Sequence, residues 1–190
     1  MAKHAILSPS GAEKWVKCAG SARMEQIFKK EETPSRYAAE GTAAHFLASE
    51  CLMHGGAPED KLGDMVVIIG DGCVFHSSMP EDFPEEQIEF MIEVDDEMKE
   101  HVDGYVGKIL EFTGPDGVLD VEQSFDISEI TGEPEAEGTS DAIIVRGTEL
   151  QVHDLKYGRK EVRAVENKQL ILYAYAAYLY YSTMYEIDSI

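Results

Sequence analysis

Residues 138–156 read GTSDAIIVRGTELQVHDLK, and their pattern is typical of a β-hairpin. Strand-like runs cover residues 140–146 and 150–156, and Gly147 and Thr148 between them fit a tight two-residue turn that begins with Gly. In that register the numbers of facing residues sum to 295, so Asp141 is predicted to lie opposite Asp154. Facing Cβ atoms in such a pair are roughly 5 Å apart.

Two carboxylates at that distance repel each other unless a proton or a cation lies between them. Lys156 is two residues from Asp154, and side chains two apart on a strand share a face. Two acids and a lysine on one face favour a divalent-metal site, because Mg²⁺ and Mn²⁺ prefer carboxylate and carbonyl oxygens. The alternative is a cross-strand aspartate pair that Lys156 and solvent satisfy.

The chain of 190 residues is predicted to form a single domain with a core of its own. No apolar run approaches the ~20 residues of a membrane helix and no leader-like N-terminus is visible, so no membrane partner is expected. The three cysteines, Cys18, Cys51 and Cys73, form no CxxC pair, which favours a reducing cytoplasm. An iron–sulfur cluster needs about four thiolates, more than this chain alone supplies.

The net charge of −21 argues against a nucleic-acid partner, but the acidity is concentrated in one segment. Residues 81–140 hold 20 acidic and 2 basic residues, a balance of −18. Within residues 156–168 the bases outnumber the acids Glu161 and Glu166; these bases are Lys156, Arg159, Lys160, Arg163 and Lys168. The acidic segment fits either a solvated face or a surface that repels DNA except along one path.

Helix and strand patterns surround the hairpin. The predicted helices cover residues 8–18, 37–53, about 95–112 and 167–181, and the further predicted strands cover residues 65–70 and 118–127. A Ser10-x-x-Glu13 capping box opens the first helix, and Asp95 or Asp96 caps the third. Strand 118–127 is expected to separate its apolar face from an acidic face, and the apolar last helix to be largely buried. Strands flanked by helices give an α/β or α+β fold.

Two further groups of polar residues accompany the hairpin. Gln169 and Tyr173 are four residues apart and project from one face of the last helix, where buried polar groups need partners. His45 on the second helix is able to ligate a metal through a ring nitrogen. Each group has a structural alternative. Gln169 and Tyr173 would bond to nearby backbone. His45 would be a lone structural His on a helix, since hard cations prefer oxygen ligands.

Taken together, these motifs resemble the PD-(D/E)XK nuclease superfamily, specifically its RecB-like branch. That branch carries a Gly-x-x-x-His helix, a Gly-x-x-Asp strand, an (Asp/Glu)-x-Lys strand and a Gln-x-x-x-Tyr helix. In this chain they read, in the same order, Gly41…His45, Gly138…Asp141, Asp154-Leu155-Lys156 and Gln169…Tyr173. The opening Leu7-Ser-Pro-Ser10 helix also resembles that branch, as it appears in an uncharacterised group encoded by phages and prophages.

The resemblance implies a restriction-endonuclease-like core, a mixed β-sheet of about three to five strands flanked by helices. It implies a site in which each residue has a role: Asp141, Asp154, His45 and the main-chain carbonyl of Leu155 bind Mg²⁺ or Mn²⁺, Lys156 is the catalytic lysine, and Gln169 and Tyr173 support the site or touch the DNA backbone. Some relatives add an iron–sulfur cluster, but only Cys18 has a matching position, so none is expected. The family's core often continues past the Gln-x-x-x-Tyr helix, which allows this chain to be the N-terminal part of a longer protein.

The resulting prediction is a metal-dependent deoxyribonuclease of the bacterial host cytoplasm, acting in phage recombination or DNA processing, with exo- and endonuclease action both open. DNA is the expected partner, and a phage recombination protein or a second copy of the chain are further partners. A second metal ion requires Glu122 or Glu40 to reach the site. The first alternative is a catalytically silent acidic interaction or nucleic-acid-mimic protein on a nuclease-like fold. The second is a structural phage component, which leaves the polar residues unexplained.

Overall fold

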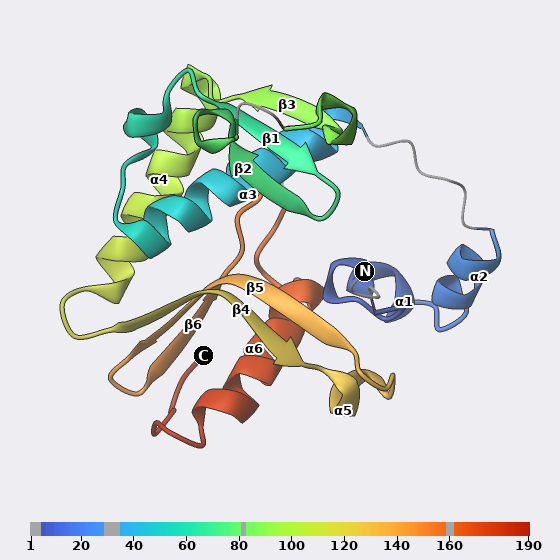
Figure 1. The fold of residues 1–190 in the computed structure, drawn as a ribbon. Coiled ribbons are helices and arrows are strands. Elements are labelled where there is room, and N and C mark those ends of the chain that lie inside the picture. Colours follow the sequence, from blue (N-terminus) through green and yellow to red (C-terminus); the bar gives the residue numbers. More distant parts are fainter. Residues whose placement is uncertain (1–4, 29–34, 81–82, 159–161) are drawn as a thin grey trace. The chain divides into compact units, whose positions relative to one another are not determined.

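The structure is a computed structural model that describes residues 5–28, 35–80, 83–158 and 162–190. The chain divides into two compact units, which are drawn together in Figure 1. Unit 1 comprises Met1–Glu32, Phe112–Asp154 and Glu161–Ile190, and unit 2 comprises Thr33–Glu111 and Leu155–Lys160. Each unit has a sheet and a hydrophobic core of its own.

Unit 1 is built on an antiparallel sheet in the order β4-β5-β6, with helix α6 packed against it (Figure 1). The strands are β4 (Val118–Asp126), β5 (Glu137–Arg146) and β6 (Glu149–His153), and the helix is α6 (Lys168–Tyr181). Ile143, Val145 and Leu150 of the sheet share one buried cluster with Ala176 and Ala177 of α6. The β-branched residues favour the strands, and the small alanines let the helix approach them closely.

The register of the predicted hairpin is confirmed. Arg146 faces Glu149 across the Gly147-Thr148 turn, so the numbers of facing residues do sum to 295. Gly147 has a φ of 61°, the left-handed conformation that this turn requires. β6 ends at His153, however, so Asp154 follows the strand instead of belonging to it, and the predicted strand is too long by three residues. The reason lies in tertiary packing, because the next residue, Leu155, joins the core of unit 2.

Strand β4 has an unusual backbone conformation at one position. Val121 pairs with Ala142 and Gln123 with Ser140, so the register is the same on both sides of Glu122. Glu122 has a φ of 52°, which costs a residue other than glycine about 1–3 kcal/mol. Asp120 and Phe125 are an odd number of residues apart and yet both contact Tyr181 of α6. The prediction of separate apolar and acidic faces along this strand is therefore wrong, because the backbone changes face between them.

The N-terminal part of unit 1 consists of short helical turns: η1 (Pro9–Gly11), α1 (Ala12–Trp15) and α2 (Ser21–Ile27), with α5 (Ser128–Thr131) following β4. The first helix thus ends earlier than predicted. The predicted capping box is wrong, because no side chain caps η1 or α1 among the described residues. Glu13 instead forms an ion pair with Lys17 across one helical turn.

Unit 2 packs two long helices against a second antiparallel sheet in the order β2-β1-β3. Its elements are α3 (Arg36–His54), β1 (Met65–Ile69), β2 (Gly72–Phe75), β3 (Phe90–Glu93) and α4 (Asp96–Thr113), with the turns η2 (Pro58–Lys61), η3 (His76–Ser78) and η4 (Glu85–Gln87). Both helices and β1 are confirmed. Gly55 ends α3 with a φ of 72°, and Asp95 caps α4 by accepting the N–H of Met98 at 2.8 Å. β2 and β3 were not predicted, because they lie among Gly and Pro residues that read as a loop.

The α+β fold is confirmed, as two three-stranded antiparallel sheets where one mixed sheet was expected. The prediction that α6 is largely buried is wrong. One face of the helix is buried against the sheet, whereas Ile171, Tyr175 and Leu179 are 42–52% exposed. Exposed tyrosines tolerate this position because their hydroxyls reach water. Of the helices that the structure describes, none has the length and apolar character needed to cross a lipid bilayer.

Candidate metal and catalytic site

Asp154 is held by a side chain of α6. The Nε2 of Gln169 donates a hydrogen bond of 2.8 Å to Oδ1 of Asp154, across 15 residues of sequence. Gln169 is fixed in turn because Asn167 caps the helix: its Oδ1 accepts the N–H groups of Gln169 and Leu170 at 3.0 and 3.2 Å. The first turn of α6 therefore sets the orientation of the carboxylate that ends the hairpin.

Tyr173 lies one helical turn after Gln169 and is only 5% exposed. Its pKa is raised to about 12, first by burial and then by the charges of Asp154, Asp141 and Glu122, while a hydrogen bond with Gln169 acts in the opposite direction. Three carboxylates are therefore near enough to act on this one hydroxyl. The structure thus brings together four of the predicted site residues, Asp141, Asp154, Gln169 and Tyr173, within unit 1.

Glu122 joins this group from the neighbouring strand. It lies between Val121 and Gln123, whose partners on β5 flank Asp141, and it has a left-handed backbone conformation. Backbone strain of this kind persists where the surrounding structure enforces it, and it is frequent at functional sites. The sequence left open whether Glu122 or Glu40 reaches the site. Glu122 belongs to the same unit as Asp141, whereas Glu40 lies in unit 2.

Gly138, the first residue of the Gly-x-x-Asp motif, is required by close packing. A Cβ atom at this position would lie 2.7 Å from Cγ of Pro9 and 3.1 Å from Cε1 of Tyr173. The missing side chain therefore allows the proline ring and the tyrosine ring to meet the strand three residues before Asp141. Pro9 is the supporting residue that sequence reasoning missed, since its position 129 residues before Gly138 gives no signal of the contact.

The segment that carries Pro9 is fastened at several points. The Glu133 carboxylate accepts the backbone N–H groups of Ile6 and Leu7 at 2.9 and 2.8 Å. The indole N–H of Trp15 donates to the carbonyl of Ser8 at 2.8 Å. The pKa of Glu13 is lowered by its hydrogen bond with Lys17 and also by a hydrogen bond from the backbone of Lys168, the first residue of α6. The N-terminal segment therefore holds the helix turn that bears Gln169.

The other three predicted site residues belong to unit 2. His45 lies half-buried on α3, next to the fully buried Ala44. Leu155 is 7% exposed and packs in the core of unit 2, so its side chain anchors the chain directly after Asp154. Lys156 is exposed. Of the predicted basic stretch, Arg159 and Lys160 lie outside the described residues, while Arg163 is exposed and Lys168 is half-buried.

The donor atoms of unit 1 suit a hard divalent cation, because Asp141, Asp154 and Glu122 offer carboxylate oxygens. Across the described ranges, no three His, Cys, Asp or Glu side chains are grouped so that they could hold a metal ion. The residue types in unit 1 therefore fit Mg²⁺ or Mn²⁺, whereas their side chains are not grouped as a formed metal site.

The family model that matches this chain is described as "Protein of unknown function (DUF2800)", and the match extends over residues 4–190. No solved structure matches the chain.

Proposed function

Since the chain belongs to the DUF2800 family, whose description assigns no activity, we propose from its own residues that it is a Mg²⁺- or Mn²⁺-dependent deoxyribonuclease that hydrolyses phosphodiester bonds. The observation that carries the proposal is the Asp154–Gln169–Tyr173 hydrogen-bonded series with Asp141 and Glu122 beside it. Carboxylates that raise the pKa of one buried tyrosine form an electrostatic environment that is frequent at functional sites. The order of motifs seen in RecB-like nucleases supports the same reading.

Each residue has a role that its chemistry supports. Within unit 1, Asp141 and Asp154 would hold the ion through their carboxylate oxygens. When bound, such an ion lowers the pKa of a water molecule and offsets the charge that develops on the phosphoryl group. Lys156 follows Asp154 by two residues, so the chain keeps their Cα atoms within about 7 Å of each other. Its ammonium group is suited to orienting the attacking water or to balancing negative charge.

Gln169 and Tyr173 are positioning residues in this proposal. Gln169 holds Oδ1 of Asp154 through its amide N–H, which fixes the direction of the carboxylate. With a pKa near 12, Tyr173 is protonated at neutral pH and therefore adds no further negative charge beside the phosphate. Its hydroxyl is able to donate to a carboxylate or to the DNA backbone.

The proposed substrate is DNA, and the proposed setting is phage recombination or DNA processing in the cytoplasm of a bacterial host. The balance of −18 in residues 81–140 would repel DNA from most of that segment, whereas the bases of residues 156–168 follow Asp154 directly in the chain. A phage recombination protein or a second copy of the chain would supply additional basic surface.

A second function is favoured by a specific observation, the same excess of 20 acidic over 2 basic residues in residues 81–140. The chain would then be a catalytically silent interaction protein or nucleic-acid mimic on a nuclease-like fold. In that case the aspartates near Tyr173 would be retained for folding or binding only.

The test is cleavage of single- and double-stranded DNA with Mn²⁺ by the wild-type chain and by Asp154→Ala and Lys156→Ala variants. We expect metal-dependent cleavage that both substitutions abolish. Asp116→Asn, an exposed aspartate in the turn before β4, is the matched control and should retain activity. Wild-type protein that leaves both DNA forms intact at every Mn²⁺ concentration would favour the silent binding protein.

A further inference from the structure

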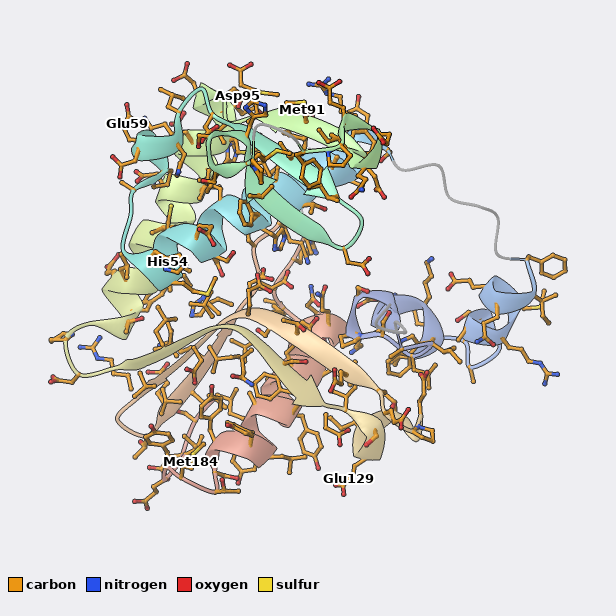
Figure 2. All side chains as sticks on the ribbon, in the orientation of Figure 1. His54, Glu59, Met91, Asp95, Glu129 and Met184 are labelled. Atoms are coloured by element: carbon orange, nitrogen blue, oxygen red, sulfur yellow. The ribbon has the colours of Figure 1, made fainter. Side chains whose placement is uncertain are left out.

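Unit 2 contains a pocket of about 810 Å³, which the proposed nuclease chemistry does not use. The first turn of α3, the end of β3, the first turns of α4 and residues 157–158 line it. Figure 2 labels Asp95, a lining residue in the loop between β3 and α4. The volume lies in the range of small-ligand sites, about 300–1,000 Å³.

The pocket has an aromatic wall and a closed inner end. Ile92 and Met98 close that end, and at 2% and 1% exposure they offer almost no surface to a ligand. The rings of Tyr157 and His101 meet edge to face, with centroids 5.6 Å apart and planes at 86°. His101 is itself fixed, because its Nδ1 lies 2.8 Å from the carbonyl oxygen of Glu97. The aromatic surface is therefore oriented before any ligand binds.

The polar residues that line the pocket are mostly acidic. Glu40, Glu93, Asp95 and Glu97 contribute four carboxylates, and Arg36 contributes one guanidinium group, whose Nε lies 3.2 Å from Glu40. The pKa of Tyr157 is raised to about 12, by burial first and then by Asp95, Glu97 and Glu40. Carboxylates from two helices and a loop thus act on one aromatic hydroxyl. A field of this sign attracts cations and opposes phosphate.

We propose that this pocket binds an aliphatic organic cation, an ammonium or guanidinium group on a methylene stem. The methylene stem would lie against the rings of Tyr37 and Tyr157, which line the pocket, and the cation would contact the Tyr157 ring and the surrounding carboxylates. An inorganic divalent ion would use the carboxylates alone and would leave the aromatic wall without a function. The same chemistry occurs in free polyamines and in the Lys and Arg side chains of proteins. This assignment is independent of the proposed nuclease activity.

Isothermal titration calorimetry of the full chain without DNA tests the proposal, in 150 mM salt so that exposed carboxylates are screened. The probes are spermidine, N-acetyl-arginine amide, N-acetyl-lysine amide and, as a control for simple charge, MgCl₂. We expect saturable binding at one site by an organic cation that MgCl₂ at equal concentration does not displace. Tighter binding of spermidine would identify a free polyamine as the ligand, and tighter binding of an amino-acid amide would identify a protein side chain.

Three variants locate the binding. Tyr157→Leu removes the ring and should weaken binding about fivefold, whereas Tyr157→Phe keeps the ring and should retain it. Glu93→Gln should weaken binding by a similar factor. Glu100→Gln changes the charge equally at an exposed position of α4 that does not line the pocket, and should have no effect. The proposal is overturned by a lack of saturable binding, by displacement with MgCl₂, or by equal losses in Glu93→Gln and Glu100→Gln. If Tyr157→Leu does not fold, the two glutamate variants decide.

Discussion

Helix α6 carries two buried tyrosines, two turns apart, whose surroundings differ. Tyr181 is 2% exposed and donates its hydroxyl proton directly to Oδ2 of Asp120. Tyr173 is 5% exposed and bonded to Gln169, which donates in turn to Asp154. The pKa of each phenol is raised, mainly by burial. One end of the helix has a single tyrosine–aspartate contact, and the other has a hydrogen-bonded series.

This difference separates a structural contact from a candidate site. At one end, the hydroxyl of Tyr181 donates to the carboxylate of Asp120, and the Tyr181 ring contacts the rings of Phe125 and Tyr180. At the Tyr173 end, Asp141 and Glu122 add negative charge that the tyrosine does not need, beside a strained strand position. Neighbouring carboxylates repel one another, and a bound cation would offset that repulsion, so the Tyr173 end is the one that we propose as a site.

The largest expected effect is on DNA cleavage, when the hydrogen bond from Gln169 to Asp154 is removed. Gln169→Leu keeps a helix-compatible side chain of comparable bulk but removes the donor that orients Asp154. Loss of such a supporting partner typically lowers activity about 10–100-fold. We therefore expect Mn²⁺-dependent DNA cleavage to fall by that factor, with a change of only a few degrees in the melting temperature. Unchanged cleavage by a folded Gln169→Leu protein would remove Gln169 from the proposed site.

The same Tyr→Phe substitution at the two ends of the helix should have opposite effects. Tyr181→Phe leaves the half-buried Asp120 without this donor, so the free energy of unfolding should fall by about 1–2 kcal/mol while the cleavage rate of the folded protein is retained. Tyr173→Phe should show the reverse, a smaller loss of stability and a larger loss of cleavage. Urea denaturation and DNA cleavage measured on both variants decide the matter. Equal behaviour of the two variants would contradict the comparison.

Local rules predicted the parts of the fold that local chemistry determines. The alternation of residues and the Gly147 turn gave the hairpin register, and Gly55 and Asp95 marked a helix end and a helix start. The end of β6 was not predictable from the hairpin itself. It depends on Leu155, whose burial in the other unit draws the chain away from the strand.

The candidate site was predictable as a set of residue types but not as an arrangement. The spacing of Gln169 and Tyr173 indicated a shared helix face, and their link to Asp154 agrees with it. The supporting contacts of Pro9 and Glu133 join segments more than 120 residues apart, and no periodicity reports them. The left-handed backbone conformation of Glu122 likewise leaves no mark on the sequence, because Glu is not a residue that favours it.

Raising the pH should lower the free energy of unfolding by a moderate amount, because the buried phenol of Tyr173 ionises. Its pKa is about 12 in the folded chain and about 10 in an unfolded one. The folded state thus holds this proton more tightly. The resulting stability is complete below pH 10 and is lost as the pH rises towards 12. The free energy of unfolding from urea titrations should decline between pH 8 and 11, and Tyr173→Phe should remove about 1–2 kcal/mol of that decline. The same decline in the variant would show that this phenol titrates normally.

The smallest predicted effect concerns the N-terminal segment, which we expect to stabilise the first turn of α6 and not the end that bears Tyr181. Glu133→Gln keeps the size of the side chain but leaves one acceptor oxygen where two accept the N–H groups of Ile6 and Leu7. The stability loss should be about 1 kcal/mol. Because this segment carries Pro9 against Tyr173, amide hydrogen exchange should accelerate in the first turn of α6 and not around Tyr181. Glu129→Gln, a nearby exposed glutamate labelled in Figure 2, is the matched control and should change neither end. Uniform acceleration along α6 would mean that the N-terminal segment supports the whole helix, and the two tyrosines would then differ in chemistry alone.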